Sequence, residues 1–369
     1  MPNVDSTATA QTQSSERWLR SAETLAIGAC GGLPLGLSGL PAGYLTGAMV
    51  AVAIASLAGR TLRLPTTFAH LLSALIGTTL GSAVSPNMVH GLGVYSVSFV
   101  ILALGTAAAT LGSTLYLRFV HKWDAVSALL GGTPGSLTQM VVLAVETKSD
   151  AIGVSIAQTV RVMLVIMLLP VVLAFFGYSF GTGTAVARPV ASLSSLALLL
   201  PASLLTAYVF AKLHFPAAWL FGSMVGSGLL HGFGVIDGGF PQTVVNMTTV
   251  CLGSIAGTRF RGLDLRTFIG YLGASVGALV VSVVIVTGFI LLDVAVAGAR
   301  MQDTAMAFAP GAMDVMMVVA LSMHLDPLFV GAHHFLRFLV VALTVPFFVR
   351  ALAPKADPLP DDELPESEI

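Results

Sequence analysis

The chain has 369 residues, of which 56% are hydrophobic and only 9% are charged. Soluble domains carry about 25% charged residues, so this composition excludes a soluble fold and favours a polytopic helical membrane protein. The net charge of −1 excludes a basic surface for nucleic acid. Cys30 and Cys251 both lie in apolar runs, which excludes a disulfide framework and a cysteine metal cluster.

Both ends of the chain are polar and contrast with the middle. Residues 1–20 are rich in Ser, Thr and Gln and lack the apolar core of a cleavable signal peptide. The last residues are acidic and rich in proline. We predict disordered tails at 1–20 and 354–369.

Twelve apolar segments lie between the tails, most of them near the ~20 residues that a bilayer crossing needs. Six belong to a first membrane repeat, residues 21–180, and cover 22–39, 42–59, 66–84, 92–118, 125–147 and 150–177. Six belong to a second repeat, residues 190–353, and cover 192–211, 216–235, 241–258, 267–292, 304–323 and 327–352. The short connections leave no room for a separate soluble domain.

The second repeat copies the first at an offset of about 176 residues. The triplet Thr133-Pro134-Gly135 matches Ala309-Pro310-Gly311. At the same offset, Met140, Asp150, Arg161 and Pro170 match Met316, Asp326, Arg337 and Pro346. Chance would not keep Pro, Asp and Arg in register, so we infer an internal duplication. Many secondary transporters are built in this way.

The positive charges predict how the repeats are oriented. In the first repeat, Lys and Arg precede the first segment and follow the second and the fourth, which places the N-terminus in the cytoplasm. In the second repeat, Arg259, Arg261 and Arg266 follow the third segment instead. They share the cytoplasmic side only if each repeat makes an odd number of crossings. We therefore expect two inverted repeats of five to six transmembrane segments, with ten and twelve total crossings both open.

The fifth segment of each repeat contains helix breakers in its middle. The first holds Gly131, Gly132, Pro134 and Gly135, and the second holds Pro310-Gly311. Proline removes a donor, and glycine adds conformational freedom. Inside a bilayer, an interrupted helix is tolerated only where it is buried in protein or lines a watery cavity.

We predict that each fifth segment is broken or re-entrant. Paired breaks at matching places in two repeats point to a transport site. The half-helix after each break would present free N–H groups and a positive dipole end to an anion. The alternative is a pair of proline kinks that serve packing.

Polar side chains gather around the two breaks and in the two sixth segments. Two polar residues follow the first break, and one acidic residue follows the second. Each sixth segment carries a deeply placed arginine with Gln or His on the same helix face. The candidate solute- and ion-binding residues are Thr133, Pro134, Gly135, Thr138, Gln139, Gln158, Arg161, Pro310, Gly311, Asp314, His333, His334 and Arg337.

Arg161 and Arg337 have two alternative roles. Their guanidinium forks fit a carboxylate, so the pair could clamp an anionic solute. They could equally be structural, each bound to a carboxylate or to the carbonyl groups of a broken helix. An ion pair between Asp314 and Arg337 is the simplest structural alternative, because a charge inside the membrane needs a partner.

His333 and His334 titrate near neutral pH and are candidate proton carriers. Adjacent residues on a helix point about 100° apart, so the pair makes a poor metal chelate. The sequence has no metal-binding motif and no phosphate-binding loop. We expect no metal, no cofactor and no ATP-driven pump.

Glycines spaced four apart, as in Gly77/Gly81 and Gly253/Gly257, let helices approach closely. The spacing serves packing within one chain or between two copies. A homodimer is therefore left open.

Two blocks of the sequence resemble the signatures of the AbrB duplication family of membrane proteins. The first is Gly132-Thr-Pro-Gly-Ser-Leu-Thr-Gln-Met140, followed by Asp150 and Arg161; the second is Ala309-Pro-Gly-Ala-Met-Asp-Val-Met316, followed by Ala332-His-His-Phe-Leu-Arg337. The resemblance extends from about residue 22 to 352. Family members often read Pro-Gly-Gly in these blocks and carry Ser-Glu where this chain has Thr138-Gln139.

The resemblance brings two labels, an ammonia monooxygenase and a regulator of gene expression, together with a kinship to secondary transporters that have inverted repeats. A copper monooxygenase needs clustered His or carboxylate ligands, and a DNA-binding regulator needs a basic module. The sequence shows neither, so we expect no enzyme and no nucleic-acid partner. The small soluble DNA-binding regulator of the same name shares nothing visible with this chain.

We expect an integral protein of the bacterial cytoplasmic (inner) membrane that transports a small, anionic organic solute, driven by a proton or sodium gradient. The alternative is a membrane sensor that acts indirectly on gene expression. A sensor usually carries a soluble output domain, and none is predicted here. The substrate, the coupling ion and the direction of transport are not encoded in any motif.

Overall fold

The computed structural model describes residues 5–40, 42–82, 95–177, 190–215 and 217–352, without the side chains of residues 5–17, Ala174 and Asp314. Within these ranges the secondary structure is helical, apart from one isolated β-bridge between Val190 and Gly239. The prediction of an all-α membrane protein is confirmed.

Every predicted apolar segment becomes a helix or a pair of helices. The first repeat contains α1 (Asp5–Leu37), α2 (Gly43–Leu57), α3 (Thr66–Gly81), α5 (Ser96–Phe119), α6 (Ala125–Gly132), α7 (Leu137–Glu146) and α8 (Ala151–Phe175). The second contains α9 (Leu193–Lys212), α10 (Ala218–Gly232), α11 (Gln242–Gly257), the short 3₁₀ helix η2 (Thr258–Phe260), α12 (Leu265–Ala297), α13 (Met301–Phe308), α14 (Met313–Ser322) and α15 (Pro327–Leu352). Both fifth segments are interrupted at the predicted place.

One boundary differs from the expectation. The stretch 1–20 was predicted to be disordered, but α1 begins at Asp5. Ala, Gln, Glu and Arg in this stretch are compatible with a helix, so the membrane segment extends outward as one helix. Residues 1–4 and the predicted tail 354–369 lie outside the described residues.

The backbone repeats as closely as the sequence does. Ala42 and Ala217 both precede a helix with positive φ, at 55° and 47°. Lys148 and His324, which are 176 residues apart, both have φ of 54°. Positive φ is uncommon for residues with a side chain, so shared values at matching positions show the same local chain path in both repeats.

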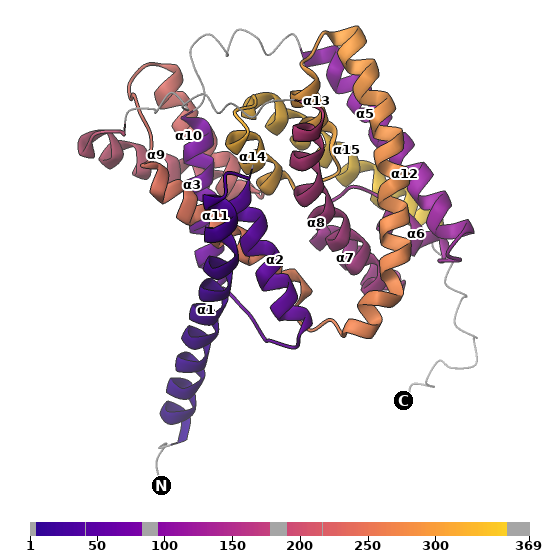
Figure 1. Ribbon diagram of the computed structural model, residues 1–369, viewed down its shortest axis with the longest axis horizontal. Coiled ribbons are helices and arrows are strands. Elements are labelled where there is room, and N and C mark those ends of the chain that lie inside the picture. The colour runs from indigo at the N-terminus through magenta and orange to yellow at the C-terminus, as the bar shows by residue number, and fades with distance from the viewer. Residues whose placement is uncertain (1–4, 41, 83–94, 178–189, 216, 353–369) are drawn as a thin grey trace, which may run out of the picture.

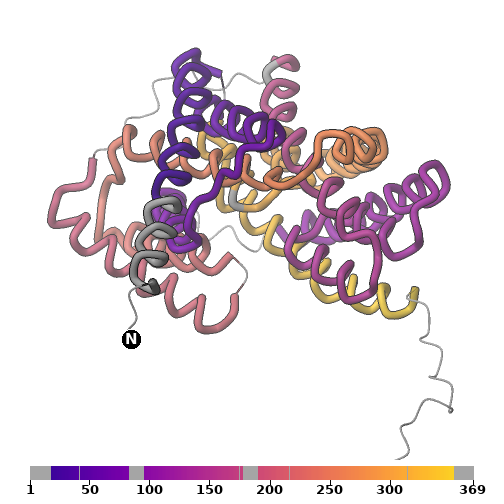
Figure 2. The backbone as a smooth tube through the Cα atoms, turned by 90° about the horizontal axis from the view of Figure 1, so that it is seen from below, coloured from indigo at the N-terminus to yellow at the C-terminus, as the bar shows by residue number. Residues whose placement is uncertain are grey.

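The helices form two bundles, and each bundle draws on both repeats (Figure 1). The flank bundle consists of α1–α3 and α9–α11. The break bundle consists of α5–α8 and α12–α15, and it holds both helix breaks. Figure 2 shows the two bundles side by side from below. Contacts between helices occur in matched pairs: α2 packs on α11 as α10 packs on α3, while α5 packs on its own counterpart α12.

Glycines allow the close contacts of the flank bundle. A side chain at Gly77 would collide with the carbonyl oxygen of Leu220 on α10, and one at Gly253 would collide with that of Leu45 on α2. Gly81 and Gly257 repeat the pattern one turn further along. These GxxxG spacings therefore serve contacts between the two repeats of one chain.

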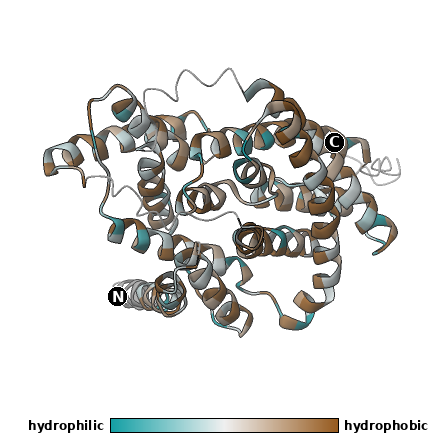
Figure 3. Cartoon of the chain, turned by 45° about the horizontal axis from the view of Figure 1, so that its top comes forward, coloured by the Kyte–Doolittle hydropathy of each residue, from teal (hydrophilic) through white to brown (hydrophobic). Residues whose placement is uncertain are grey.

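Hydrophobic residues predominate along the long helices (Figure 3). Phe347 is 70% exposed and Val284 67% exposed, which is unfavourable in water but suits lipid. Five described helices, α5, α8, α9, α12 and α15, are long and apolar enough to cross a membrane. Helices α2 and α10 have 15 residues each and span only about 22 Å at 1.5 Å per residue, so the number of crossings stays a prediction.

Arginines from both repeats lie on one face of the molecule. Arg20, Arg60 and Arg261 line a common hollow beside Asp264. An inverted arrangement of the repeats requires these groups to share a side of the membrane. The orientation of that side toward the cytoplasm stays a prediction from the positive-inside rule.

Candidate functional site

The helix breaks leave backbone carbonyl groups without their usual partners. Helix α6 ends at Gly132, and Pro134, which follows, has no N–H to donate to the carbonyl of Leu130. The second break, at Pro310, does the same to Met306 at the end of α13. In the membrane interior these carbonyl groups need donors from the protein.

Gln158 and Arg161 on α8 supply the donors at the first break. Gln158 Nε2 donates to the carbonyl oxygens of Leu130, at 2.6 Å, and Thr133, at 2.9 Å. Arg161 Nη1 donates to the Thr133 oxygen at 2.9 Å, and its Nη2 donates to Gln158 Oε1. Arg161 Nε reaches the other break and donates to the Pro310 oxygen at 3.0 Å.

His334 and Arg337 on α15 do the same at the second break. Arg337 donates to the carbonyl oxygens of Ala309, at 2.6 Å, and Gly311, at 3.0 Å. Arg337 Nη2 also donates to His334 Nδ1 at 2.6 Å, and His334 Nε2 contacts the Met306 oxygen at 3.1 Å.

These partners fix the tautomer of His334. Arginine can only donate and a carbonyl can only accept, so Nδ1 of His334 is unprotonated and Nε2 carries the hydrogen. His334 therefore replaces the amide of Gln158, which is its counterpart 176 residues earlier. The imidazole serves here as a neutral hydrogen-bonding group.

Both arginines thus serve the carbonyl groups of the breaks, the structural alternative that the sequence left open. Each is only 5% exposed. Among the described side chains no carboxylate lies within ion-pair distance of either guanidinium. The expected pair between Asp314 and Arg337 concerns a side chain that lies outside the described part.

A cavity of about 660 Å³ lies between the two bundles at the breaks. The break bundle contributes the first residues of α7 and α14 and the groups that support them. The flank bundle contributes the adjoining ends of α3, α9, α10 and η2. The lining consists of His70, Ser73, Pro134, Gly135, Ser136, Leu137, Thr138, Gln158, Val162, Ala211, His214, Phe215, Ala217, Ala218, Trp219, Leu220, Arg259, Gly311, Ala312, Met313, His334, Arg337 and Phe338.

The described lining is cationic and amphipathic. Arg259 and Arg337 contribute positive charges, and the His70 ring stacks on Trp219 with 5.2 Å between ring centroids. The N-terminal turns of α7 and α14 face the cavity, and neither Ser136 nor Ala312 caps them with a side chain. Uncapped N–H groups and the helix dipole favour a negative group at these ends.

The predicted site residues fall into three sets. Those that line the cavity are Pro134, Gly135, Thr138, Gln158, Gly311, His334 and Arg337. Those that lie directly behind it, in the hydrogen-bond network of the breaks, are Thr133, Arg161 and Pro310. Those that are not brought to it are Gln139, whose Oε1 is buried without a partner among the described residues, and His333, which faces α5.

Sequence reasoning missed the flank side of the cavity. His70 and His214 are not among the predicted site residues, and Arg259 enters the sequence analysis only as a guide to orientation. No periodic pattern marks these residues, because their proximity to the breaks is set by packing between bundles. Their position at the ends of segments nearest the predicted cytoplasmic side was the available signal.

Two tyrosines tie the repeats together across the break bundle. Tyr271 on α12 donates to Asp150 Oδ2 at 2.6 Å, and Tyr95, its counterpart, hydrogen-bonds Asp326. Both aspartates cap the following helix, Asp150 through Gly153 N and Asp326 through two backbone N–H groups. In both pairs the tyrosine hydroxyl is the donor, because a carboxylate only accepts.

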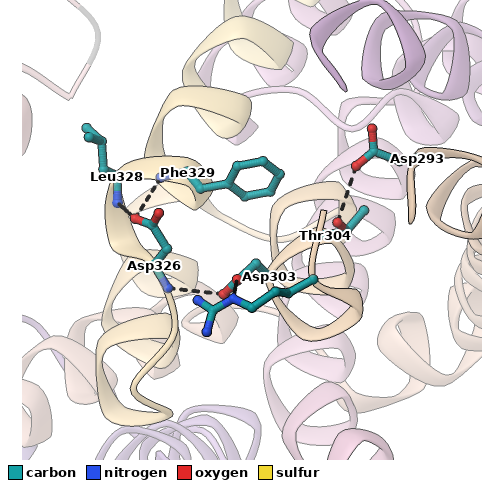
Figure 4. A network of polar contacts seen from close by, with 7 residues as sticks. Asp293, Asp303, Thr304, Asp326, Leu328 and Phe329 are labelled. Atoms are coloured by element: carbon teal, nitrogen blue, oxygen red, sulfur yellow. Dashed lines mark hydrogen bonds and ion pairs between the residues drawn. The ribbon is translucent and has the colours of Figure 1, made fainter. Parts of the chain in front are cut away.

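A second polar cluster surrounds α13 (Figure 4). The first repeat copies only its contact to the aspartate N–H, where Ser127 Oγ accepts from the Asp150 N–H at 2.8 Å. Asp303 pairs with Arg300 and accepts from the Asp326 N–H at 3.1 Å. Asp293 on α12 accepts from the Thr304 hydroxyl at 3.2 Å. In the part of the chain that the structure describes, no three His, Cys, Asp or Glu side chains are grouped to hold a metal ion.

The family of the chain follows from comparison with known proteins. A family model described as "Transition state regulatory protein AbrB" matches residues 44–353. The chain belongs to the AbrB family. It is 28% identical over 367 residues to "Uncharacterized protein YhjN" of Bacillus subtilis (strain 168), which covers 90% of this chain and 93% of that protein. The family model begins in α2 and spans both breaks, so the duplicated core described above is the family's shared region.

Proposed function

We propose that this AbrB-family protein is a secondary transporter of a small, anionic organic solute, driven by a proton or sodium gradient. One observation carries the proposal: both helix breaks meet at a single cavity that lies between two bundles. A packing kink has no need for a cavity. Paired breaks at the interface of duplicated repeats form the solute sites of many secondary transporters.

The charge of the lining supports an anionic solute. Arg259 is half-buried at the cavity wall, and the first turns of α7 and α14 present their N–H groups to it. A carboxylate there would gain from the helix dipoles and from a guanidinium partner. The apolar wall around Trp219 and Phe215 suits a small organic body.

The arrangement of the bundles supports alternating access. The flank residues of the cavity belong to η2 and to the ends of α3, α9 and α10 that are nearest to Arg60, Lys212 and Arg261. The cavity therefore opens toward the face predicted to be cytoplasmic. Movement of the break bundle against the flank bundle would carry both breaks, with the bound solute, to the other side.

A membrane regulator that binds a ligand without transporting it is the second candidate. The description of the family model as a transition state regulatory protein favours it. The same cavity would then hold a signal molecule, and any effect on gene expression would be indirect. In both cases the expected role is binding rather than catalysis.

Thermal unfolding of the purified full-length protein tests the solute site. Small carboxylates, amines and amino acids are compared, each over a range of concentrations. A ligand at 100 times its Kd stabilises the folded state by about 2.7 kcal/mol. We expect carboxylates, and no amine, to raise Tm.

Arg259→Gln and Arg266→Gln form a matched pair for this test. Arg259 lines the cavity, whereas Arg266 is exposed and does not. We expect Arg259→Gln to weaken carboxylate binding about tenfold, or 1.4 kcal/mol, and Arg266→Gln to leave it unchanged. Equal binding in both variants would remove the cavity assignment, and no binding to folded protein would remove the anionic solute.

Exchange of the bound compound across proteoliposomes separates the two candidate functions. A transporter exchanges labelled for unlabelled solute across the membrane without any ion gradient. Binding without exchange would favour the regulator.

A further inference from the structure

The carboxyl group of Asp293 is buried within the break bundle, at 0% exposure. Thr304 donates to its Oδ2, and the side chain of Ser98 on α5 lies beside the carboxyl. Its Oδ1 has no partner within the normal hydrogen-bond distance among the described residues. A buried carboxylate without a cation is costly, so the group needs either a proton or a charged neighbour.

His333 supplies that neighbour through Ser98. The Ser98 hydroxyl lies 2.7 Å from Nε2 of His333, and Nδ1 of His333 lies 2.7 Å from the Phe329 carbonyl oxygen. Because a carbonyl only accepts, Nδ1 carries a hydrogen. Nε2 is then the atom that gains or loses a proton, and it faces Ser98.

We propose that Asp293, Ser98 and His333 form a proton-binding site, in which one proton passes between the carboxyl and the imidazole through the Ser98 hydroxyl. In the transfer, the Asp293 O–H bond breaks as its proton bonds to Ser98 Oγ, and the original Ser98 proton bonds to His333 Nε2. The products are a carboxylate and an imidazolium, and Ser98 is unchanged. The proposal rests on the proposed transport function, for which it names the proton as the coupling ion.

The Ser98 hydroxyl can serve both protonation states of the site. With the proton on Asp293, the carboxyl donates to Ser98 and Ser98 donates to His333. With the proton on His333, the directions reverse and Ser98 donates to the carboxylate. A hydroxyl can play both roles because it has one donor and two acceptor sites.

The other charged groups around the site already have partners. Asp303 is paired with Arg300, and Asp326 accepts from Tyr95 and from the first turn of α15. Arg337, one turn beyond His333 on α15, is bound to carbonyl groups, and His334 is held neutral by its partners. Asp293 and His333 are thus the groups left to share a proton.

The geometry suits a proton rather than a sodium ion. The site offers one carboxyl and two hydroxyls, and the contacts at 2.7 Å and 3.2 Å are direct hydrogen bonds. A cation bound by oxygen ligands would have to separate these groups. Its usual ligand set of several carboxylates and carbonyls is absent among the described residues around Asp293.

The position of the site links it to the solute cavity. Thr304 belongs to α13, whose end forms the second break, and His333 is four residues before Arg337. A proton that moves onto His333 places a new charge one helical turn from the guanidinium that holds this break. Proton binding therefore biases the half-helices that line the cavity.

Infrared pH-difference spectroscopy of the full-length protein in liposomes tests the site with the proton alone as ligand. We expect a protonated-carboxyl band that is lost in Asp293→Asn and kept in Asp237→Asn, which removes an exposed carboxyl. In His333→Gln the midpoint of the band should move by about one pH unit or more, because coupled groups titrate together.

Ser98→Ala tests whether the serine hydroxyl connects the two titrating groups. The carboxyl and imidazole remain, but their connection is lost, so adding His333→Gln to Ser98→Ala should leave the midpoint nearly unchanged. A band that survives Asp293→Asn, or a midpoint indifferent to His333→Gln, overturns the proposal. A spectrum that responds to sodium at fixed pH, and not to protons, overturns it in favour of a sodium site.

These outcomes are independent of the solute site. If carboxylates fail to bind, the proposed transport fails while the infrared titration still stands. If carboxylates bind and exchange but the titration is absent, only the proton site fails. In a coupled transporter, Asp293→Asn should lose accumulation of solute driven by a pH gradient.

Discussion

The two repeats place matching helices around two different interiors. In one, Asp293, Thr304, Ser98 and His333 form a polar cluster. In the other, the corresponding residues are Leu117, Ala128, Ala274 and Ala157, and the first three pack together in an apolar cluster. The fold is built equally well around either set. The polar set is therefore not required for the helices to pack, and its presence on one side points to a task other than stability.

At the helix breaks, by contrast, the two repeats are alike. Gln158 and Arg161 serve the first break with the same pattern of hydrogen bonds by which His334 and Arg337 serve the second. Both breaks expose carbonyl groups within the membrane, and both need the same donors. Features shared by the repeats thus report on what the fold demands, and features confined to one repeat report on what the protein does.

The largest effect is expected where the apolar interior is given a carboxyl group. Leu117→Asp would bury an acid beside Ala128 and Ala274, which stand where the polar cluster has Thr304 and Ser98. We expect thermal unfolding in detergent to show a loss of about 3–5 kcal/mol. The reciprocal Asp293→Leu should cost less, about 1–3 kcal/mol, because it strands only the Thr304 hydroxyl and its neighbours.

Leu117→Met is the control for this pair, and its cost should stay below about 1.5 kcal/mol. Equal losses in Leu117→Asp and Asp293→Leu would mean that the polar cluster is needed for folding after all. The difference between the two interiors would then give no support to a functional role for the polar cluster.

Removal of either buried arginine should give the next largest effect. Arg161→Ala and Arg337→Ala each remove two hydrogen bonds from a charged donor and leave one carbonyl group, that of Pro310 or Gly311, without its side-chain donor. We therefore expect similar losses of about 2–4 kcal/mol. Arg266→Ala, at an exposed site, should change stability by less than about 0.5 kcal/mol. A marked difference between the two repeats would contradict their shared structural role.

The tyrosine hydrogen bonds between the repeats should contribute less to the free energy of unfolding. Tyr271→Phe and Tyr95→Phe each remove one hydrogen bond to a carboxylate, which is worth about 1.5 kcal/mol. The matching loss should appear in chemical or thermal unfolding of both variants. Tyr208→Phe, on an exposed face of α9, is the control, and a loss there as large as at Tyr271 would show that the hydroxyl contacts are not the cause.

The smallest effect on stability is expected from exchanging the residue types at the matching positions 158 and 334. Gln158→His and His334→Gln each keep one acceptor for an arginine and one donor for a carbonyl, so stability should change by less than about 1 kcal/mol. Alanine at either position should cost about 1–3 kcal/mol. If the exchange costs as much as alanine, the two side chains are not interchangeable supports.

The duplication and the breaks could be predicted because they depend on local chemistry. Pro134 and Pro310 interrupt a helix wherever they fall, and the constant offset survives in residues such as Arg161 and Arg337. The sequence left two roles open for the arginines, a clamp for an anion or a donor to backbone carbonyl groups. Which role applies depends on where the breaks place their carbonyl groups, and this is set by tertiary structure.

The polar cluster was missed for a definable reason. Asp293 directly follows the last residue of the predicted segment 267–292 and is not among the predicted site residues. Helix α12 continues to Ala297, which carries Asp293 into the interior. Ser98 and His333 are 235 residues apart, and only tertiary packing brings them together.

The glycine contacts of the flank bundle also determine how the protein can be made. Helix α3 packs on α10, and α2 packs on α11, through surfaces at Gly77 and Gly253 that leave no room for a side chain. Each of these helices therefore finds a closely packed partner in the other repeat. While the chain is being synthesised, α2 and α3 enter the bilayer long before α10 and α11 exist, and they must wait in lipid without these partners. The chain assembles like two subunits that happen to share one polypeptide, and the closing of the flank bundle is a late event.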